Sequence, residues 1–144
     1  LAKSLVVRGW RVVVLGGPAD IVTADRIFAD IRVESMVGKA ALLESAALVG
    51  HADLVIGVDT GLTHMGWAFK VPTIALFGST CPYRDLGGLR GAVLYKNMTC
   101  SPCRRKPVCG GTYDCLAALY PDSVIESMAG LLRDKSASGS VVAS

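Results

Sequence analysis

Three short runs of apolar residues, each closed by glycine or small polar residues, limit the fold of this chain more than any other feature. They are residues 11–15, 54–58 and 73–77. An apolar run of this length without polar alternation is typical of a strand that is buried on both faces of a parallel sheet. The closing segments are Gly16-Gly17-Pro18, Asp59-Thr60-Gly61 and Gly78-Ser79-Thr80. We therefore expect three loops at the carboxyl ends of parallel strands.

Segments with apolar residues at helical spacing alternate with these runs. The pattern predicts helices over residues 20–31, 41–49, 62–69 and 122–133, the end of an amphipathic helix over 1–8, and further short strands over 34–37 and 92–95. Strands that alternate with helices form a parallel sheet covered on both faces. The predicted fold class is α/β, with a Rossmann-like sheet that binds ligands at the carboxyl ends of its strands.

The composition of the chain favours one globular domain. Of its 144 residues, 51% are hydrophobic and 19% are charged, which predicts a compact domain over residues 1–134, and the serine-rich residues 135–144 are expected to form a flexible tail. No apolar run is long enough to span a bilayer, so we expect a soluble, cytoplasmic protein. The net charge of +3 gives no broad surface for nucleic acid. Because the chain starts inside a predicted helix, it is expected to be half of a larger protein.

The segment Asp59-Thr60-Gly61 is the strongest candidate site, because it joins a buried strand to a helix. A helix that begins at Gly61 directs unpaired N–H groups and a positive dipole end towards this junction, which suits a diphosphate. His64 follows Thr60 by one helical turn and is expected to face the same opening. The alternatives are that Asp59 or Thr60 only caps the helix, and that His64 only fills the core.

Neighbouring strand ends supply further candidates. Gly17 and Asp20 follow the first strand, and the loop 37–41 with Ala40 follows the second, so we expect ribose and base contacts there. Asp20 has an alternative role, in which it only complements a helix dipole. Thr80 follows the third long strand and is expected to form the opposite wall of the cleft, and Arg84 is either a ligand or a solvated charge.

Four of the five cysteines lie in a loop over residues 97–115. Cys100, Cys103, Cys109 and Cys115 have a density that can hold a structural Zn²⁺, and the first pair has the spacing of a zinc knuckle. Disulfides or reduced thiols remain alternatives. The basic cluster Arg104-Arg105-Lys106 faces either an anionic acceptor or solvent, and Cys81 is expected to be a small loop residue.

The ordered set of motifs resembles the carboxyl-terminal half of the heptosyltransferase family, the family 9 glycosyltransferases. The resemblance rests on Asp59-Thr60-Gly61 with His64, then Ala68, Pro72, Leu76-Phe77-Gly78, Thr80 and Pro82, and finally the four cysteines of the loop. It covers the chain from about Gly9 to Leu132, and Ala40-Ala41 departs from the Ser or Thr found in many relatives.

The resemblance implies a GT-B enzyme with two Rossmann-like domains, which transfers heptose with inversion from ADP-heptose to the inner core of lipopolysaccharide. It implies that Thr60 and Gly61 hold the diphosphate, with His64 near the phosphate or the sugar. It also implies that the amino-terminal acceptor domain is absent here, that catalysis requires no metal, and that the enzyme works at the inner face of the inner membrane.

Two other interpretations remain open. In the first, the chain is a zinc-stabilised interaction module whose working surface is the cysteine loop. In the second, it is a dinucleotide-binding oxidoreductase domain, which is disfavoured because Gly16-Gly17-Pro18 lacks the third glycine of that fingerprint.

Overall fold

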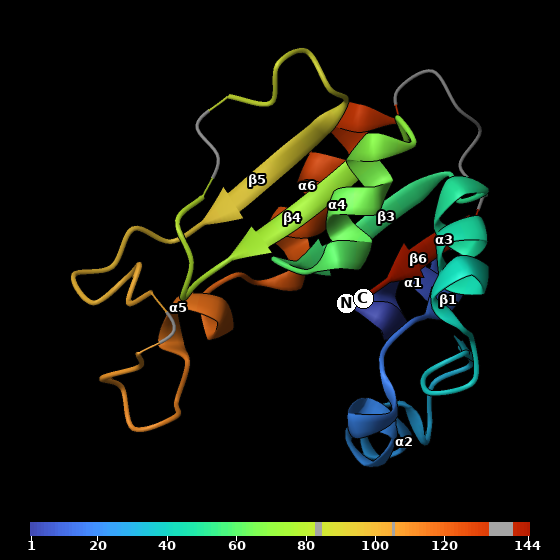
Figure 1. Cartoon of the computed structure of the whole chain (residues 1–144), viewed down its shortest axis with the longest axis horizontal. Coiled ribbons are helices and arrows are strands. Elements are labelled where there is room, and N and C mark those ends of the chain that lie inside the picture. The colour runs from blue at the N-terminus through green and yellow to red at the C-terminus, as the bar shows by residue number, and fades with distance from the viewer. Residues whose placement is uncertain (83–84, 105, 133–139) are drawn as a thin grey trace.

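A single parallel sheet organises the chain. The computed structural model describes residues 1–82, 85–104, 106–132 and 140–144. Within these residues the sheet has the strand order β2-β1-β6-β3-β4-β5, and every pair of neighbours is parallel (Figure 1). The strands are β1 (Arg11–Val14), β2 (Glu34–Ser35), β3 (Leu54–Val58), β4 (Thr73–Phe77), β5 (Gly91–Tyr95) and β6 (Ser140–Ala143).

Helices cover both faces of this sheet, as the sequence predicted. They are α1 (Ala2–Val7), the 3-10 turn η1 (Pro18–Asp20), α2 (Ile21–Phe28), α3 (Leu42–Gly50), α4 (Gly61–Ala68), α5 (Asp114–Ala117) and α6 (Pro121–Leu131). Figure 1 shows α3 and α4 on one side of the sheet and α6 on the other. The α/β fold class with a Rossmann-like sheet is therefore confirmed.

Alternating residues of the central strands build two apolar layers. Val12 of β1 belongs to the layer under α1, α2 and α6, whereas Val13 belongs to the layer under α3. A third, smaller cluster contains Trp67 of α4 and Phe77 of β4. The continuous apolar runs in the sequence follow from this arrangement, because both faces of each strand are removed from water.

Several boundaries differ from those predicted. The helix predicted over 20–31 begins as the turn η1 and continues as α2 to Phe28, and the strand predicted over 34–37 is reduced to β2. The last helix, α6, ends at Leu131, and Arg133 lies outside the described residues. Helix α5 within the cysteine loop was not predicted, because its single turn is too short to show helical periodicity.

The prediction of a flexible tail over 135–144 is wrong for residues 140–144. These residues form β6, in which Val141 pairs with Val12 of β1 and Val142 pairs with Val55 of β3. Val141 and Val142 are buried, and their β-branched side chains are well suited to a strand. The serines on either side of them made this strand hard to recognise in the sequence. Asp53 holds the start of the strand, since its Oδ2 accepts from the Ser140 N–H at 3.0 Å. Residues 135–139 lie outside the described part of the chain.

No helix in the described ranges combines the length and the apolar character needed to cross a membrane.

Candidate functional site

The turn from β3 to α4 places the predicted diphosphate segment at the carboxyl edge of the sheet. β3 ends at Val58, Thr60 is extended at φ −133° and ψ 165°, and α4 begins at Gly61. The Thr60 N–H donates to the Val58 carbonyl at 2.8 Å, which fixes the turn. The Thr60 side chain makes no capping hydrogen bond among the described residues. The first amides of α4 are therefore not capped by this hydroxyl, contrary to the capping alternative for Thr60.

Thr63 anchors this turn, a structural role that the sequence analysis missed. Its side chain is buried, and its hydroxyl donates to the Val58 carbonyl at 2.6 Å. The same oxygen lies 3.3 Å from Oγ of Ser144 and 3.5 Å from Oγ1 of Thr60. Thr63 thus ties the first turn of α4 to the end of β3. Its position three residues after Thr60, on the same face of the helix, is the only signal that the sequence carries for this role.

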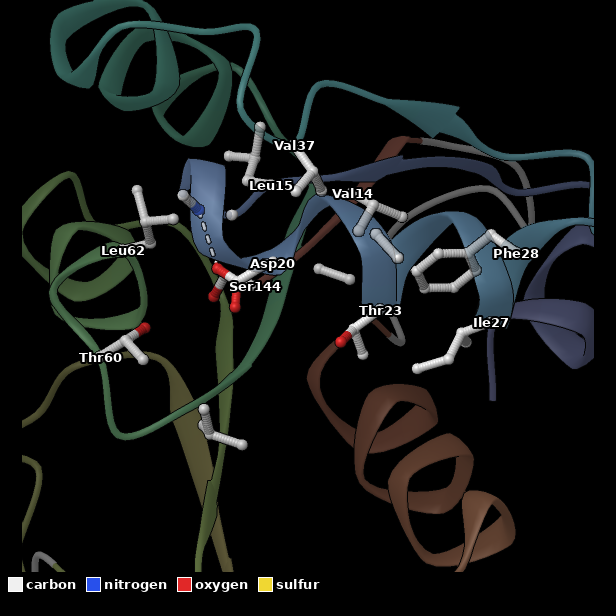
Figure 2. Close-up of a pocket in the computed structure, with 15 residues that line it drawn as sticks. Val14, Leu15, Asp20, Thr23, Ile27, Phe28, Val37, Thr60, Leu62 and Ser144 are labelled. Atoms are coloured by element: carbon white, nitrogen blue, oxygen red, sulfur yellow. Dashed lines mark hydrogen bonds between the residues drawn. The ribbon is translucent and has the colours of Figure 1, made fainter.

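A cavity of about 490 Å³ opens beside this turn, at the carboxyl ends of β1, β6 and β3. Figure 2 shows Thr60 and Leu62 on one side of it and Asp20, Thr23 and Phe28 on the other. The lining is mostly apolar, and its residues are Val14, Leu15, Gly16, Gly17, Asp20, Thr23, Ala24, Ile27, Phe28, Val37, Val58, Thr60, Leu62, Ala143 and Ser144. The structure therefore brings Gly17, Asp20 and Thr60 together as predicted, and adds the end of β6 to the walls.

Asp20 already has a structural role at this cavity. Its Oδ2 accepts from the Gly17 N–H at 2.9 Å, which closes the turn between β1 and α2 (Figure 2). This contact stabilises the first turn of η1 through a hydrogen bond, and it does not test the alternative in which Asp20 only complements a helix dipole. Because the carboxylate also lines the cavity, contact with a ligand hydroxyl stays a prediction.

A second, smaller hollow of about 150 Å³ lies on the other side of Val58. Asp59, Ser79 and Thr80 line it, so the ends of β3 and β4 meet there as parallel strand ends should. Gly78 and Leu116 complete much of its wall. The candidate residues thus occupy two adjoining hollows, with Thr60 in the larger and Asp59 and Thr80 in the smaller.

His64 is paired with Asp59 at the surface between α4 and β3. Its Nε2 lies 3.0 Å from Oδ1 of Asp59, and its side chain is 43% exposed. The ring also meets Trp67 edge to face, with the ring centroids 5.9 Å apart. A side chain with this exposed fraction does not belong to the core, so the alternative in which His64 only fills the core is not supported.

Not every candidate lines a hollow, and Gly61 and His64, which neighbour Thr60 and Asp59 in the turn, line neither of them. Ala40 lines neither hollow, whereas Val37 from the same loop lines the larger one. The loop turns away at Gly38, which has φ +67°, so the chain leaves the cavity before Ala40. Arg84 and Arg105 lie outside the described residues.

The four cysteines of the loop line one small cavity of about 20 Å³, while Cys81 is exposed and lies outside that cavity. All five thiols are free. Within the described ranges, no three His, Cys, Asp or Glu side chains are arranged so that they could hold a metal ion. The predicted structural zinc site therefore has no support from this geometry.

Solved structures with a similar fold define the class of this domain. A glycosyl transferase family 9 structure from Veillonella parvula aligns with a TM-score of 0.73 and 24% identity, over 93% of this chain and 40% of that chain. The structure of E. coli ADP-heptose lps heptosyltransferase II aligns with a TM-score of 0.74 and 22% identity, over 90% and 38%. The chain therefore shares its Rossmann-like fold with part of each of these two structures.

Sequence comparison identifies the family. The model described as "Glycosyltransferase family 9 (heptosyltransferase)" matches residues 1–113, and the chain therefore belongs to glycosyltransferase family 9. Lipopolysaccharide heptosyltransferase 1 of Pseudomonas aeruginosa is 32% identical over 108 residues, which are 74% of this chain and 30% of that protein. Lipopolysaccharide heptosyltransferase 2 of E. coli K12 is 24% identical over 95% of this chain and 41% of its own length. The chain spans less than half of each of these relatives.

Proposed function

We propose that this chain is the nucleotide-sugar-binding, carboxyl-terminal half of an inverting heptosyltransferase. The donor in this proposal is ADP-heptose, and the acceptor is a sugar of the lipopolysaccharide inner core. Membership of family 9 and the names of the similar enzymes support the proposal. The chain on its own is expected to bind the donor without turnover, because the proposed general base comes from an amino-terminal domain.

The observation that carries the proposal is the uncapped start of α4 beside the larger cavity. The Thr60 side chain leaves the first amides of α4 uncapped, and a Cβ built at Gly61 would meet no atom within 4 Å. A diphosphate can therefore approach this backbone closely, and the helix dipole favours its charge. From there the nucleoside extends into the apolar cavity towards Asp20. The volume of about 490 Å³ lies within the usual range for small-molecule sites.

The same geometry suits displacement of a nucleoside diphosphate. Negative charge grows on the leaving phosphate as the acceptor oxygen attacks the sugar, and donors that are already in place stabilise this charge without reorganising. The proposed donors are the Gly61 amide and the Thr60 hydroxyl, because the Thr60 N–H already donates to the Val58 carbonyl at 2.8 Å. The His64 imidazole is a further proposed donor, and Asp59 holds its ring in place through Nε2. We assign the smaller hollow, which Thr80 lines, to the sugar of the donor.

In this proposal no divalent cation is needed, because the amides and the imidazole supply positive potential at the diphosphate. The acceptor is carried by a lipid, so the complete enzyme would work at the cytoplasmic face of the inner membrane with at most peripheral contact. Its partners are the nucleotide sugar, the lipopolysaccharide core and the amino-terminal domain.

A pair of substitutions at Gly61 tests the proposal. Proline is well tolerated at the first helical position, where its missing N–H has no intrahelical partner. Gly61→Pro therefore removes the proposed phosphate donor with little effect on the helix. Gly61→Ala keeps the N–H and places its Cβ in open space, so it is the matched control. In calorimetric titration with ADP, Gly61→Pro should weaken binding by about tenfold or more, as expected for the loss of one hydrogen bond to a charged group.

Equal ADP affinity in the two variants would contradict the proposed diphosphate site. An absence of ADP binding in the unmodified chain, together with tight binding of zinc, would favour the competing zinc-stabilised interaction module.

A further inference from the structure

The cysteine loop brings four thiols to one place, and the proposed function does not use them. Cys100, Cys103, Cys109 and Cys115 all line the cavity of about 20 Å³, which has room for roughly one water-sized molecule. Ser79, at the end of β4, forms part of the wall. The cavity is therefore a small pocket with sulfur on several sides.

Cys109 has the most activated thiol of this group. Backbone N–H groups of Tyr113 and Gly111 point at its sulfur, and they lower the pKa of Cys109, with a smaller contribution from the Thr112 hydroxyl. The local backbone explains these contacts, since Gly110, Gly111 and Tyr113 all have positive φ values of 60°, 92° and 50°. The Thr112 N–H, between Gly111 and Tyr113, donates instead to the Cys109 carbonyl at 3.2 Å. The side chain is also partly exposed, so a reagent can reach it.

Cys103 is the best-placed partner for Cys109. The Lys106 N–H, which lies between the two cysteines in sequence, donates to the Cys103 carbonyl at 3.0 Å. The Cys103 thiol is partly exposed and has only a long 4.0 Å contact with the Ser79 carbonyl. Cys115, in contrast, is buried in α5, and its sulfur would lie 3.0 Å from a Cβ at Gly78. Cys115 is thus enclosed by packing, whereas the Cys103 thiol is partly exposed.

We propose that Cys109 and Cys103 form a reversible oxidation site, in which hydroperoxides convert the two thiols to a disulfide that closes the cysteine loop. The proposal stands on the shared cavity, the turn between the two residues and the amides around Cys109. It does not depend on the nucleotide site.

The reaction has two steps. The Cys109 thiolate attacks one oxygen of the hydroperoxide, the O–O bond breaks, and the other oxygen leaves as hydroxide or alkoxide and takes a proton from water. Sulfur is oxidised by two electrons to a sulfenic acid, and the peroxide is reduced. The Cys103 sulfur then attacks the sulfenic sulfur, the S–S bond forms, and hydroxide leaves and combines with the thiol proton as water. A dithiol reductant restores both thiols by exchange.

The experiment treats the whole chain with hydrogen peroxide, blocks the remaining thiols with N-ethylmaleimide and maps the peptides by mass spectrometry. The expected product links Cys103 to Cys109 and disappears after dithiothreitol. Cys109→Ser should abolish the link. Cys103→Ser should leave a sulfenic acid on Cys109 that dimedone traps. Cys81→Ser is the matched control, since Cys81 is exposed but outside the cavity, and this variant should behave as the unmodified chain.

Three results would overturn the proposal. One is oxidation of Cys81 as fast as Cys109, because the amides around Cys109 would then give it no advantage. Another is a disulfide that excludes Cys109. The third is one tightly bound zinc ion per purified chain that requires Cys103 and Cys109, since the loop would then be a metal site.

Discussion

The imidazole of His64 and the carboxylate of Asp59 form a close pair across the start of α4, with Nε2 of His64 3.0 Å from Oδ1 of Asp59. The Asp59 side chain is only 20% exposed, so without this partner its charge would oppose a diphosphate at the neighbouring amides. We propose that Asp59 orients the ring through Nε2, so that the other ring nitrogen can act as a donor to the diphosphate.

Removal of the imidazole should therefore weaken binding of phosphate groups and leave base recognition intact. We expect His64→Ala to bind ADP about tenfold more weakly, because the donor is lost and the Asp59 charge is left uncompensated. Asp59→Asn should have a smaller effect, since the amide can still hold the ring. Calorimetry with ADP measures both changes, and adenosine serves as the control ligand because it carries no phosphate. A similar loss for adenosine would point to a structural defect.

Binding of ADP should not depend on divalent cations. The positive potential at the proposed diphosphate site comes from backbone amides and His64, and neither depends on added metal. Titrations with ADP in magnesium and in EDTA should give affinities within about twofold of each other, a difference below 0.5 kcal/mol. An affinity that collapses in EDTA would show that a cation bridges the protein and the nucleotide.

Two helical glycines should respond to alanine in opposite directions. A Cβ at Gly66 in α4 would lie 2.4 Å from Oγ1 of the buried Thr73, so Gly66→Ala should destabilise the fold by about 1–3 kcal/mol through overpacking. A Cβ at Gly130 in α6 would meet nothing within 4 Å, and Gly130→Ala should stabilise by about 0.5–1 kcal/mol through helix propensity. Denaturation in urea measures both. If the two variants shift stability alike, α4 does not pack against β4 as closely as described.

The central position of β6 can be tested with a charge. Val142 is buried between β1 and β3, so Val142→Asp should cost about 3 kcal/mol or more and unfold much of the protein. Val108→Asp is the control, because Val108 is 79% exposed. Thermal unfolding followed by circular dichroism gives the comparison. Equal melting temperatures for Val142→Asp and the unmodified chain would restore the flexible-tail interpretation.

Most of the sheet could be predicted because the sequence of each of its longer strands has a recognisable local pattern. β3 and β4 are continuous apolar runs with glycine or polar residues behind them, and these signals also place Asp59, Thr60 and Thr80 at strand ends. β6 gave no comparable signal, since its two valines follow a serine-rich stretch and their burial depends entirely on β1 and β3. A partner that is distant in sequence cannot be seen in a local pattern.

The candidate site could likewise be predicted only in part. The motif around Asp59 predicted family membership correctly, and the match over residues 1–113 confirms it. The sequence did not reveal that Val58 separates two hollows, or that Thr63 anchors the turn through the Val58 carbonyl. The sequence also did not reveal that Ala40 lies outside the lining of the larger cavity, because the turn at Gly38 depends on a positive φ that an isolated glycine does not specify.

The strand order also has a kinetic consequence. Gly17 follows β1 and Thr60 follows β3, and these two residues line the larger cavity on different sides. Within the described sheet, β6 is the only strand that is hydrogen-bonded to both β1 and β3. Each half of the sheet can assemble from segments near one another in sequence, whereas insertion of β6 closes the longest loops in the molecule. We therefore expect ligand binding to be the last property recovered during refolding, well after most of the helical signal has returned.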